Sequence, residues 1–284
     1  MLEDDEIKAV TYNSWLSEPK RPPRVQLQII DDRRFSVDGN MYLQASRTVN
    51  LTEKSYSQAI RHELRHLTFS PEQWATWADW TVMLAKANYR ADEIQQTLNI
   101  FTDIQVDRSL FKDYGDDFKR LFQEMLNEYW VEPRLPITLL YLRAHENFMG
   151  TNILPKQDEQ LERDAQDLEF WALEGNWPVE ERILECAKII RRYIPPPNEE
   201  SPFHPDGYGK GQGQPRNGQE AMERIAEKAE REGLTPDQAR EALKTVKKPS
   251  YEGGKGGVGS VEVDVETAED LLLNARSCGS SAAS

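Results

Sequence analysis

Between residues 53 and 193 the apolar side chains recur at intervals of three and four positions, which is the spacing of one face of an α-helix. Proline and glycine interrupt this pattern several times, and such interruptions mark the ends of helices. The pattern predicts seven helices, at residues 54–69, 72–90, 92–112, 116–130, 136–148, 158–174 and 178–193. Amphipathic helices in such close succession must bury their apolar faces against one another, so helix packing dominates the expected fold.

A small sheet is expected before the first of these helices. Residues 25–30 alternate between apolar and polar side chains, as in a half-buried strand, and residues 41–51 form a second candidate strand. The pair Asp38-Gly39 marks a turn between them. The predicted class is therefore α+β, a mostly helical domain with a small N-terminal sheet.

The composition changes near residue 195. Residues 196–219 are rich in proline, glycine and polar residues, and they carry too little apolar surface to form a core. We therefore expect residues 1–195 to form one domain that folds alone. Residues 196–284 are expected to form a Pro/Gly-rich linker, a polar helical segment and a flexible tail.

Two local elements are predicted within this C-terminal part. A polar helical stretch covers about residues 220–248 and breaks at Thr235, which should cap a second helix that begins with Pro236. Further on, the segment VEVDV has the composition of a short strand.

The chain carries a formal net charge of −14 at pH 7, spread along the sequence. Surfaces that follow nucleic-acid phosphates need clustered lysine and arginine, so nucleic acid is excluded as a partner. No apolar run approaches the ~18 residues of a membrane span and no signal peptide is recognisable, so we expect no membrane association. With only Cys186 and Cys278, no disulfide framework is expected, and we predict a cytoplasmic protein whose metal ligands are histidines and carboxylates.

The sequence His62-Glu63-Leu64-Arg65-His66 lies within the first predicted helix. Residues four apart project from one helix face with Cβ atoms about 5–6 Å apart, so the imidazoles of His62 and His66 can converge on one zinc ion. Glu63 points close to the open coordination position, where it can accept a proton from a zinc-bound water whose pKa the metal lowers to about 7. The motif thus predicts two metal ligands and a general base on one rigid element.

The same motif has a purely structural interpretation, a surface helix in which Arg61 and Arg65 form salt bridges. Two observations favour the metal site instead. The chain contains only four histidines, and two of them fall in this pattern. In addition, Tyr56, Ile60 and Leu67 give the helix an apolar stripe that should face a core.

A third ligand is expected from the segment NIFTDIQVDR. Asn99, Asp103 and Asp107 are spaced at i, i+4 and i+8, so they form one polar row on a helix whose other positions are largely apolar. Apolar surroundings imply burial, and buried carboxylates need a cation or a metal as partner. The alternative is a row that caps a helix, pairs with arginine or faces solvent.

The combination of HELRH with NIFTDIQVD resembles the gluzincin, or thermolysin-like, type of zinc peptidase. It is more similar still to the short metallopeptidase-like domains associated with von Willebrand factor A proteins, whose second helix reads Asn-x-x-x-Asp. The resemblance covers roughly residues 25–115 and implies a zincin-like fold with one zinc per chain. The roles that it implies are metal ligands for His62, His66 and Asp103, general base for Glu63, and support behind the ligands for Asp107 and Asn99.

The chain differs from the thermolysin pattern in having aspartate, not glutamate, at the third ligand position. Because the aspartate side chain is shorter, the two helices must approach each other more closely. Matching both patterns places Asp103 at the metal and Asp107 behind a ligand histidine, whose tautomer it would hold.

Two further features deserve mention. His145, on the predicted helix PITLLYLRAHENF, is a candidate catalytic residue that donates to the transition state; the alternative is a partly buried structural histidine. Trp74, Trp77 and Trp80 occur at intervals of three and are expected to pack in the core rather than to form a binding platform.

These features predict a zinc-dependent metalloendopeptidase, a hydrolase that cleaves peptide or protein substrates. The alternative is a non-catalytic adaptor on a zincin scaffold, with a structural zinc and a tail that tethers a partner. By resemblance alone, that partner would be an AAA+ ATPase or a von Willebrand factor A protein. A metal-free helical scaffold would require both motifs to be coincidences.

Overall fold

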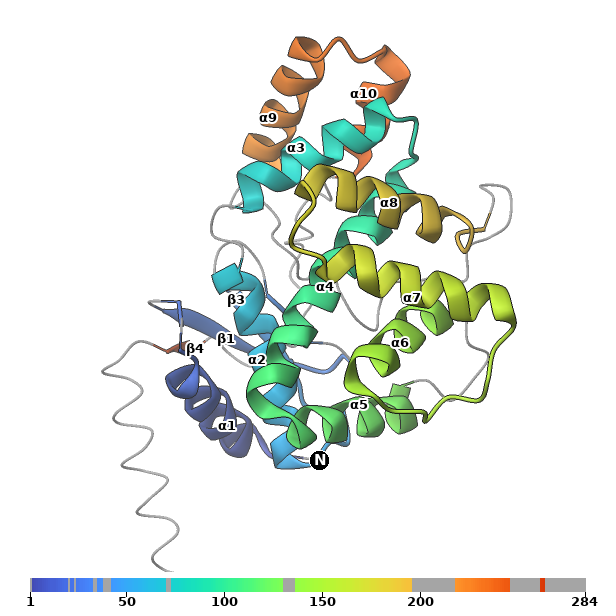
Figure 1. The fold of residues 1–284 in the computed structure, drawn as a ribbon. Helices are drawn as coiled ribbons and strands as arrows, with labels where there is room; N and C mark the ends of the chain where they lie inside the picture. The colour runs from blue at the N-terminus through green and yellow to red at the C-terminus, as the bar shows by residue number, and fades with distance from the viewer. Residues whose placement is uncertain are drawn as a thin grey trace, which may run out of the picture.

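The computed structural model describes residues 2–19, 21–22, 24–32, 35–37, 42–69, 73–129, 136–195, 218–245 and 261–263. In chain order the elements are α1 (Asp4–Ser17), β1 (Val25–Ile30), β2 (Ser36–Val37), β3 (Tyr42–Ser46), α2 (Glu53–Phe69), α3 (Gln73–Lys86), α4 (Ala91–Tyr114), α5 (Asp116–Tyr129), α6 (Pro136–Met149), α7 (Glu159–Leu173), α8 (Val179–Arg191), α9 (Gly218–Arg231), α10 (Pro236–Lys244) and β4 (Val261–Val263). The protein is mostly helical with a small mixed sheet (Figure 1), so the predicted α+β class is confirmed.

The sheet has the strand order β2-β3-β1-β4. Strands β1 and β3 are parallel, whereas β2 pairs antiparallel with β3 and β4 pairs antiparallel with β1. The predicted alternation in β1 is observed, because every second residue from Val25 onward is buried. Strand β3 ends at Ser46, before the predicted limit, because the chain must turn to start α2, where the Thr52 side chain accepts a hydrogen bond from the Ser55 amide.

All seven predicted helices are observed, as α2 to α8. The largest difference is in α3, which ends at Lys86 rather than at residue 90. Asn88 adopts a positive φ of 61°, and the Tyr89 amide donates back to the Leu84 carbonyl at 3.1 Å. This left-handed turn terminates the helix.

Helix α1 is not predicted by the apolar pattern. Its buried face includes Ile7, Val10, Thr11, Ser14 and Trp15, which have helical spacing. Two of these five side chains are polar, so the apolar stripe is weak. The Ser14 hydroxyl satisfies its hydrogen-bonding capacity by donating to the Val10 carbonyl at 2.7 Å, which allows it to be buried.

Helix α4 runs through the middle of the molecule and contacts α2, α3, α5, α6, α7, α8 and α10 (Figure 1). Its side chains Ile94, Leu98, Phe101 and Ile104 are fully buried. A helix surrounded in this way has almost no face left for solvent, so its polar side chains must also face other helices. This arrangement places the acidic row of α4 inside the protein.

Helices α9 and α10 pack on α3, and α10 also contacts α4. Ile225 and Ala242 are buried there, Lys228 pairs with Asp79 at 2.7 Å, and Glu241 accepts a hydrogen bond from the Ala91 amide at 2.9 Å. Part of the C-terminal region therefore contacts the main helical body through both apolar and polar groups.

The local elements predicted for this region are also present. Thr235 caps α10, accepting a hydrogen bond from the Gln238 amide, with Pro236 in the first turn. Strand β4 occurs within the VEVDV segment. Of the predicted linker, residues 196–217 lie outside the described residues, as does the Asp38-Gly39 turn, whereas residues 218 and 219 begin α9. No helix within the described part of the chain combines the length and the apolar character that crossing a bilayer requires.

Candidate metal centre

His62 and His66 lie one turn apart on α2 and point toward α4. Both are buried, with exposed fractions of 2% and 4%. Their Nε2 atoms are 3.0 Å apart, and their rings meet at an interplanar angle of 75°. The i, i+4 spacing therefore produces the predicted convergence of two imidazole nitrogens.

Asp103 on α4 completes a group of three ligand atoms. Its Oδ1 lies 3.2 Å from His66 Nε2 and 3.8 Å from His62 Nε2. In a tetrahedral zinc site with bonds of about 2.0–2.1 Å, ligand atoms are about 3.3–3.4 Å apart. The three observed separations bracket that value, so His62, His66 and Asp103, called the metal group below, could hold a metal ion.

Asp107 lies one turn further along α4 and is as buried as Asp103. Its Oδ1 is 2.6 Å from His62 Nδ1, the ring nitrogen that faces away from the metal group. A carboxylate in this position accepts a hydrogen bond from the Nδ1–H group of the ring. This keeps the proton on Nδ1 and leaves the Nε2 lone pair free to bind a metal. Asp107 therefore has the geometry expected of a group that orients a ligand histidine.

The other oxygen of Asp107 is held from α6. Its Oδ2 is 2.7 Å from His145 Nε2 and accepts a hydrogen bond from the Tyr141 hydroxyl at 3.1 Å. His145 is fully buried, and its Nδ1 lies 2.8 Å from the Tyr141 carbonyl oxygen. Both ring nitrogens of His145 are therefore engaged within the protein.

Glu63 is buried beside the metal group without belonging to it. Among the described residues, no side chain or amide forms a hydrogen bond with its carboxylate. Burial raises the pKa of Glu63, and Asp103 and Asp107 add to this effect, whereas His62 and His66 oppose it. A raised pKa makes the Glu63 carboxylate a stronger proton acceptor than an ordinary glutamate.

The carboxylates and histidines around the metal group shift each other's pKa values. Burial alone would lower the pKa of His62, yet Asp107, Glu63 and Asp103 together raise it to about 10. Burial would likewise raise the pKa of Asp107, but His62 and His145 hold it well below its usual range. Carboxylates so close together inside a protein favour a cation among them, which is the condition that a divalent metal meets.

The structural alternatives for these motifs both require exposure to solvent, and the structure places the motifs in the interior. Asp103 and Asp107 do not face solvent, because each is only 4% exposed. Arg65 does form ion pairs, with Glu18 and Asp113, but it is buried, so α2 is not a surface helix. Asn99 is half-buried one turn before Asp103, and its supporting role remains a prediction.

Tyr141 is the site residue that sequence reasoning did not identify. It precedes His145 by four positions, so one face of α6 brings both side chains to Asp107. The four-residue spacing of Tyr141 and His145 can be recognised in the sequence, but the packing of α6 against α4 cannot. The expected apolar stripe of α2 is confirmed, with Tyr56 and Ile60 buried and Leu67 partly buried, and Trp80 packs in the core against Phe101.

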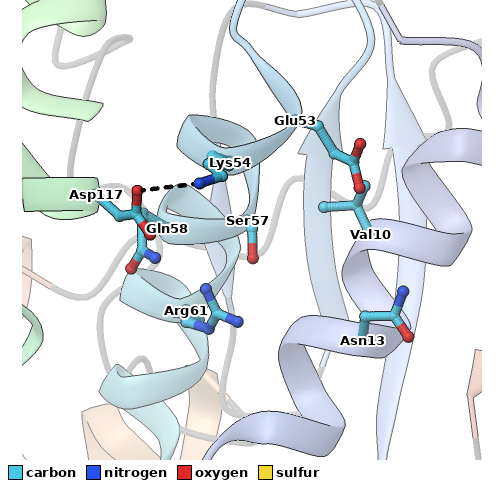
Figure 2. Close-up of a pocket in the computed structure, with 8 residues that line it drawn as sticks. All are labelled: Val10, Asn13, Glu53, Lys54, Ser57, Gln58, Arg61 and Asp117. Atoms are coloured by element: carbon cyan, nitrogen blue, oxygen red, sulfur yellow. Dashed lines mark ion pairs between the residues drawn. The ribbon is translucent and has the colours of Figure 1, made fainter. Parts of the chain in front are cut away.

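A polar pocket of about 230 Å³ lies between α1, α2 and the start of α5 (Figure 2). Ser57, Gln58 and Arg61 line it, and an ion pair of 3.7 Å between Lys54 and Asp117 stands at its edge. No member of the metal group is among its lining residues.

No protein-family model, curated protein or solved structure matches this chain. The candidate metal centre consists of three buried ligand atoms, a carboxylate behind one ligand and a second carboxylate beside the group.

Proposed function

We propose that the protein is a zinc-dependent peptidase that hydrolyses peptide bonds in peptide or protein substrates. One observation carries the proposal: the metal group brings three ligand atoms together, and Glu63 lies next to them without being one of them. Catalytic zinc sites typically have three protein ligands and keep one position open, whereas structural sites have four protein ligands.

In this proposal each residue has a separate task. His62, His66 and Asp103 hold the ion, which when bound supplies a Lewis acid that polarises a carbonyl and lowers the pKa of a water molecule. The Glu63 carboxylate takes a proton from the attacking water as the new C–O bond forms. It then delivers that proton to the amine nitrogen as the C–N bond breaks. Glu63 thus acts first as general base and then as general acid, and it ends in its starting protonation state.

The family and the partners belong to the same proposal. The resemblance of HELRH and NIFTDIQVD to gluzincin peptidases, and to the short domains associated with von Willebrand factor A proteins, supports zinc as the metal. It also suggests an AAA+ ATPase or a von Willebrand factor A protein as partner of the C-terminal region.

Replacement of Glu63 by glutamine tests the enzyme directly. Glu63→Gln preserves the shape of the side chain but removes its proton-accepting oxygen, so zinc content and fold should persist while cleavage falls by at least about 100-fold. Cleavage of casein and of a mixed peptide library by the zinc-loaded full chain is the measurement. Glu53→Gln, at the exposed start of the same helix, is the matched control and should cleave at the wild-type rate. Equal rates in wild type and Glu63→Gln would reject Glu63 as base.

A second function, an adaptor with a structural zinc, is favoured by the burial of the site. None of His62, Glu63, His66 and Asp103 exceeds 4% exposure, and such closure suits a metal that stabilises a fold. In that case the zinc-loaded wild type would cleave nothing, and its thermal stability would fall sharply when a chelator removes the metal.

A further inference from the structure

We propose that His145 is a positioning residue for the metal centre: it fixes the carboxylate of Asp107, which in turn orients the ligand ring of His62. This inference rests on the proposed metal site, but not on whether that site hydrolyses peptides. It makes α6 part of the metal centre, although α6 supplies no ligand.

The hydrogen bonds around His145 define its role. Nδ1 lies 2.8 Å from the Tyr141 carbonyl oxygen, which can only accept, so Nδ1 must donate. This bond ties the ring to the preceding turn of its own helix. When the ring carries a proton on each nitrogen, Nε2 donates to Asp107 Oδ2 at 2.7 Å, within the range of a strong, charge-assisted hydrogen bond.

Packing prevents the His145 ring from turning away. The ring stacks on Phe122 of α5, with centroids 5.7 Å apart and planes 12° from parallel, and also contacts Phe148 at 5.0 Å. The side chain is only 1% exposed. A side chain held by two hydrogen bonds and by contacts with two aromatic rings is well suited to hold another group in place.

The consequence reaches the metal through Asp107. His145 and the Tyr141 hydroxyl both bind Oδ2, so the carboxylate cannot rotate without losing two hydrogen bonds. Oδ1 therefore stays 2.6 Å from His62 Nδ1, and His62 Nε2 stays directed at the metal group. Because both ring nitrogens of His145 are occupied, this geometry favours positioning over direct contact with a substrate.

The test measures zinc affinity by chelator competition in the full-length chain. His145→Phe keeps an aromatic ring beside Phe122 but removes both donors, and it should lower zinc affinity by about tenfold, the lower end of the range for groups behind metal ligands. His145→Gln retains an amide N–H that can reach Asp107, so it should recover most of this loss.

A double-mutant comparison separates positioning from a general effect on packing. If His145 acts through Asp107, His145→Phe should have almost no further effect on zinc affinity once Asp107→Asn is present. An undiminished tenfold loss in that background would overturn the proposal, as would wild-type affinity in His145→Phe alone.

A spectroscopic measurement keeps the proposal testable if His145→Phe folds poorly. In the zinc-loaded wild type and in His145→Gln, the ring nitrogen resonances of His62 should report a protonated Nδ1 bonded to Asp107. If the tautomer of His62 changed in Tyr141→Phe but not in His145→Gln, the Tyr141 hydroxyl and not residue 145 would fix the Asp107 carboxylate. That result would overturn the proposal. Loss of hydrolysis plays no part in either readout, so an inactive but zinc-binding protein would reject the proposed enzyme and leave this inference standing.

Discussion

Helix α2 carries two polar clusters that differ in how their charges are balanced. On the side of α1, Arg65 pairs with Glu18 at 3.0 Å and with Asp113 at 2.6 Å, and it donates to the Ser109 hydroxyl at 2.7 Å. Arg61 lies 3.7 Å from Glu18 and stacks over the ring of Tyr114. Each acid in this cluster has its cation within the protein.

The metal group, whose two histidines lie on the same helix, is the opposite case. Three acids, Glu63, Asp103 and Asp107, lie around His62 and His66, and the two Nε2 atoms and Asp103 Oδ1 converge on one point. Asp103 lies beside His62 and His66, and Asp107 lies beside His62 and His145, so histidines take the place that the arginines have in the first cluster. The difference teaches that a complete cluster, with arginines as cations, fastens α1 and α4 to α2, whereas an incomplete one, with histidine nitrogens at the acids, offers ligand atoms to a metal.

The largest loss of stability should follow from breaking the complete cluster. Arg65→Met leaves buried Glu18 without its closest cation, so the free energy of unfolding should fall by about 3 kcal/mol, as for other broken buried pairs. Urea denaturation of the zinc-loaded protein measures this change, and zinc content should stay the same. Arg163→Met, which removes the exposed pair with Glu159, is the matched control and should change stability by less than about 0.5 kcal/mol. Similar values for the two variants would show that the arginine cluster does not fasten the helices.

The next largest effect should come from the incomplete cluster itself. Asp103→Ala removes one of three ligands, so zinc affinity should fall by more than about 100-fold, beyond the range of supporting residues. Asp107→Ala removes no ligand atom but only the carboxylate that holds His62 Nδ1, so its loss should be smaller, about 10–100-fold. Zinc titration of the two variants side by side ranks them, and the reverse ranking would show that Asp107 is the ligand.

The sequence was sufficient to predict those parts of the site that depend on spacing within one helix. His62 and His66 converge because they are four residues apart, and the row containing Asp103 and Asp107 is fixed by the same periodicity. The apolar residues around that row predict that it is buried. Buried carboxylates need a cation as partner, so the sequence also predicts a cation near Asp103 and Asp107.

Contacts between helices distant in sequence could not be predicted in the same way. Nothing in the sequence near His145 specifies that α6 packs against α4, so its hydrogen bond to Asp107 is visible only in the fold. The pairing of Arg65 with Glu18, at the C-terminal end of α1, depends on a helix that the apolar pattern does not reveal. Thr11 and Ser14 are polar residues at buried positions of that helix. They interrupt the apolar periodicity from which the helix could have been predicted.

Zinc content of the purified full-length chain tests the central claim most directly. Wild type and Glu63→Gln should each hold about one zinc per chain after incubation with the metal and removal of excess, because Glu63 is not a ligand. The double variant His62→Ala, His66→Ala should hold almost none, since two of three ligands are gone, while circular dichroism checks that its helices persist. A wild-type protein that retains no zinc, or a folded double variant that retains as much as wild type, would contradict the account.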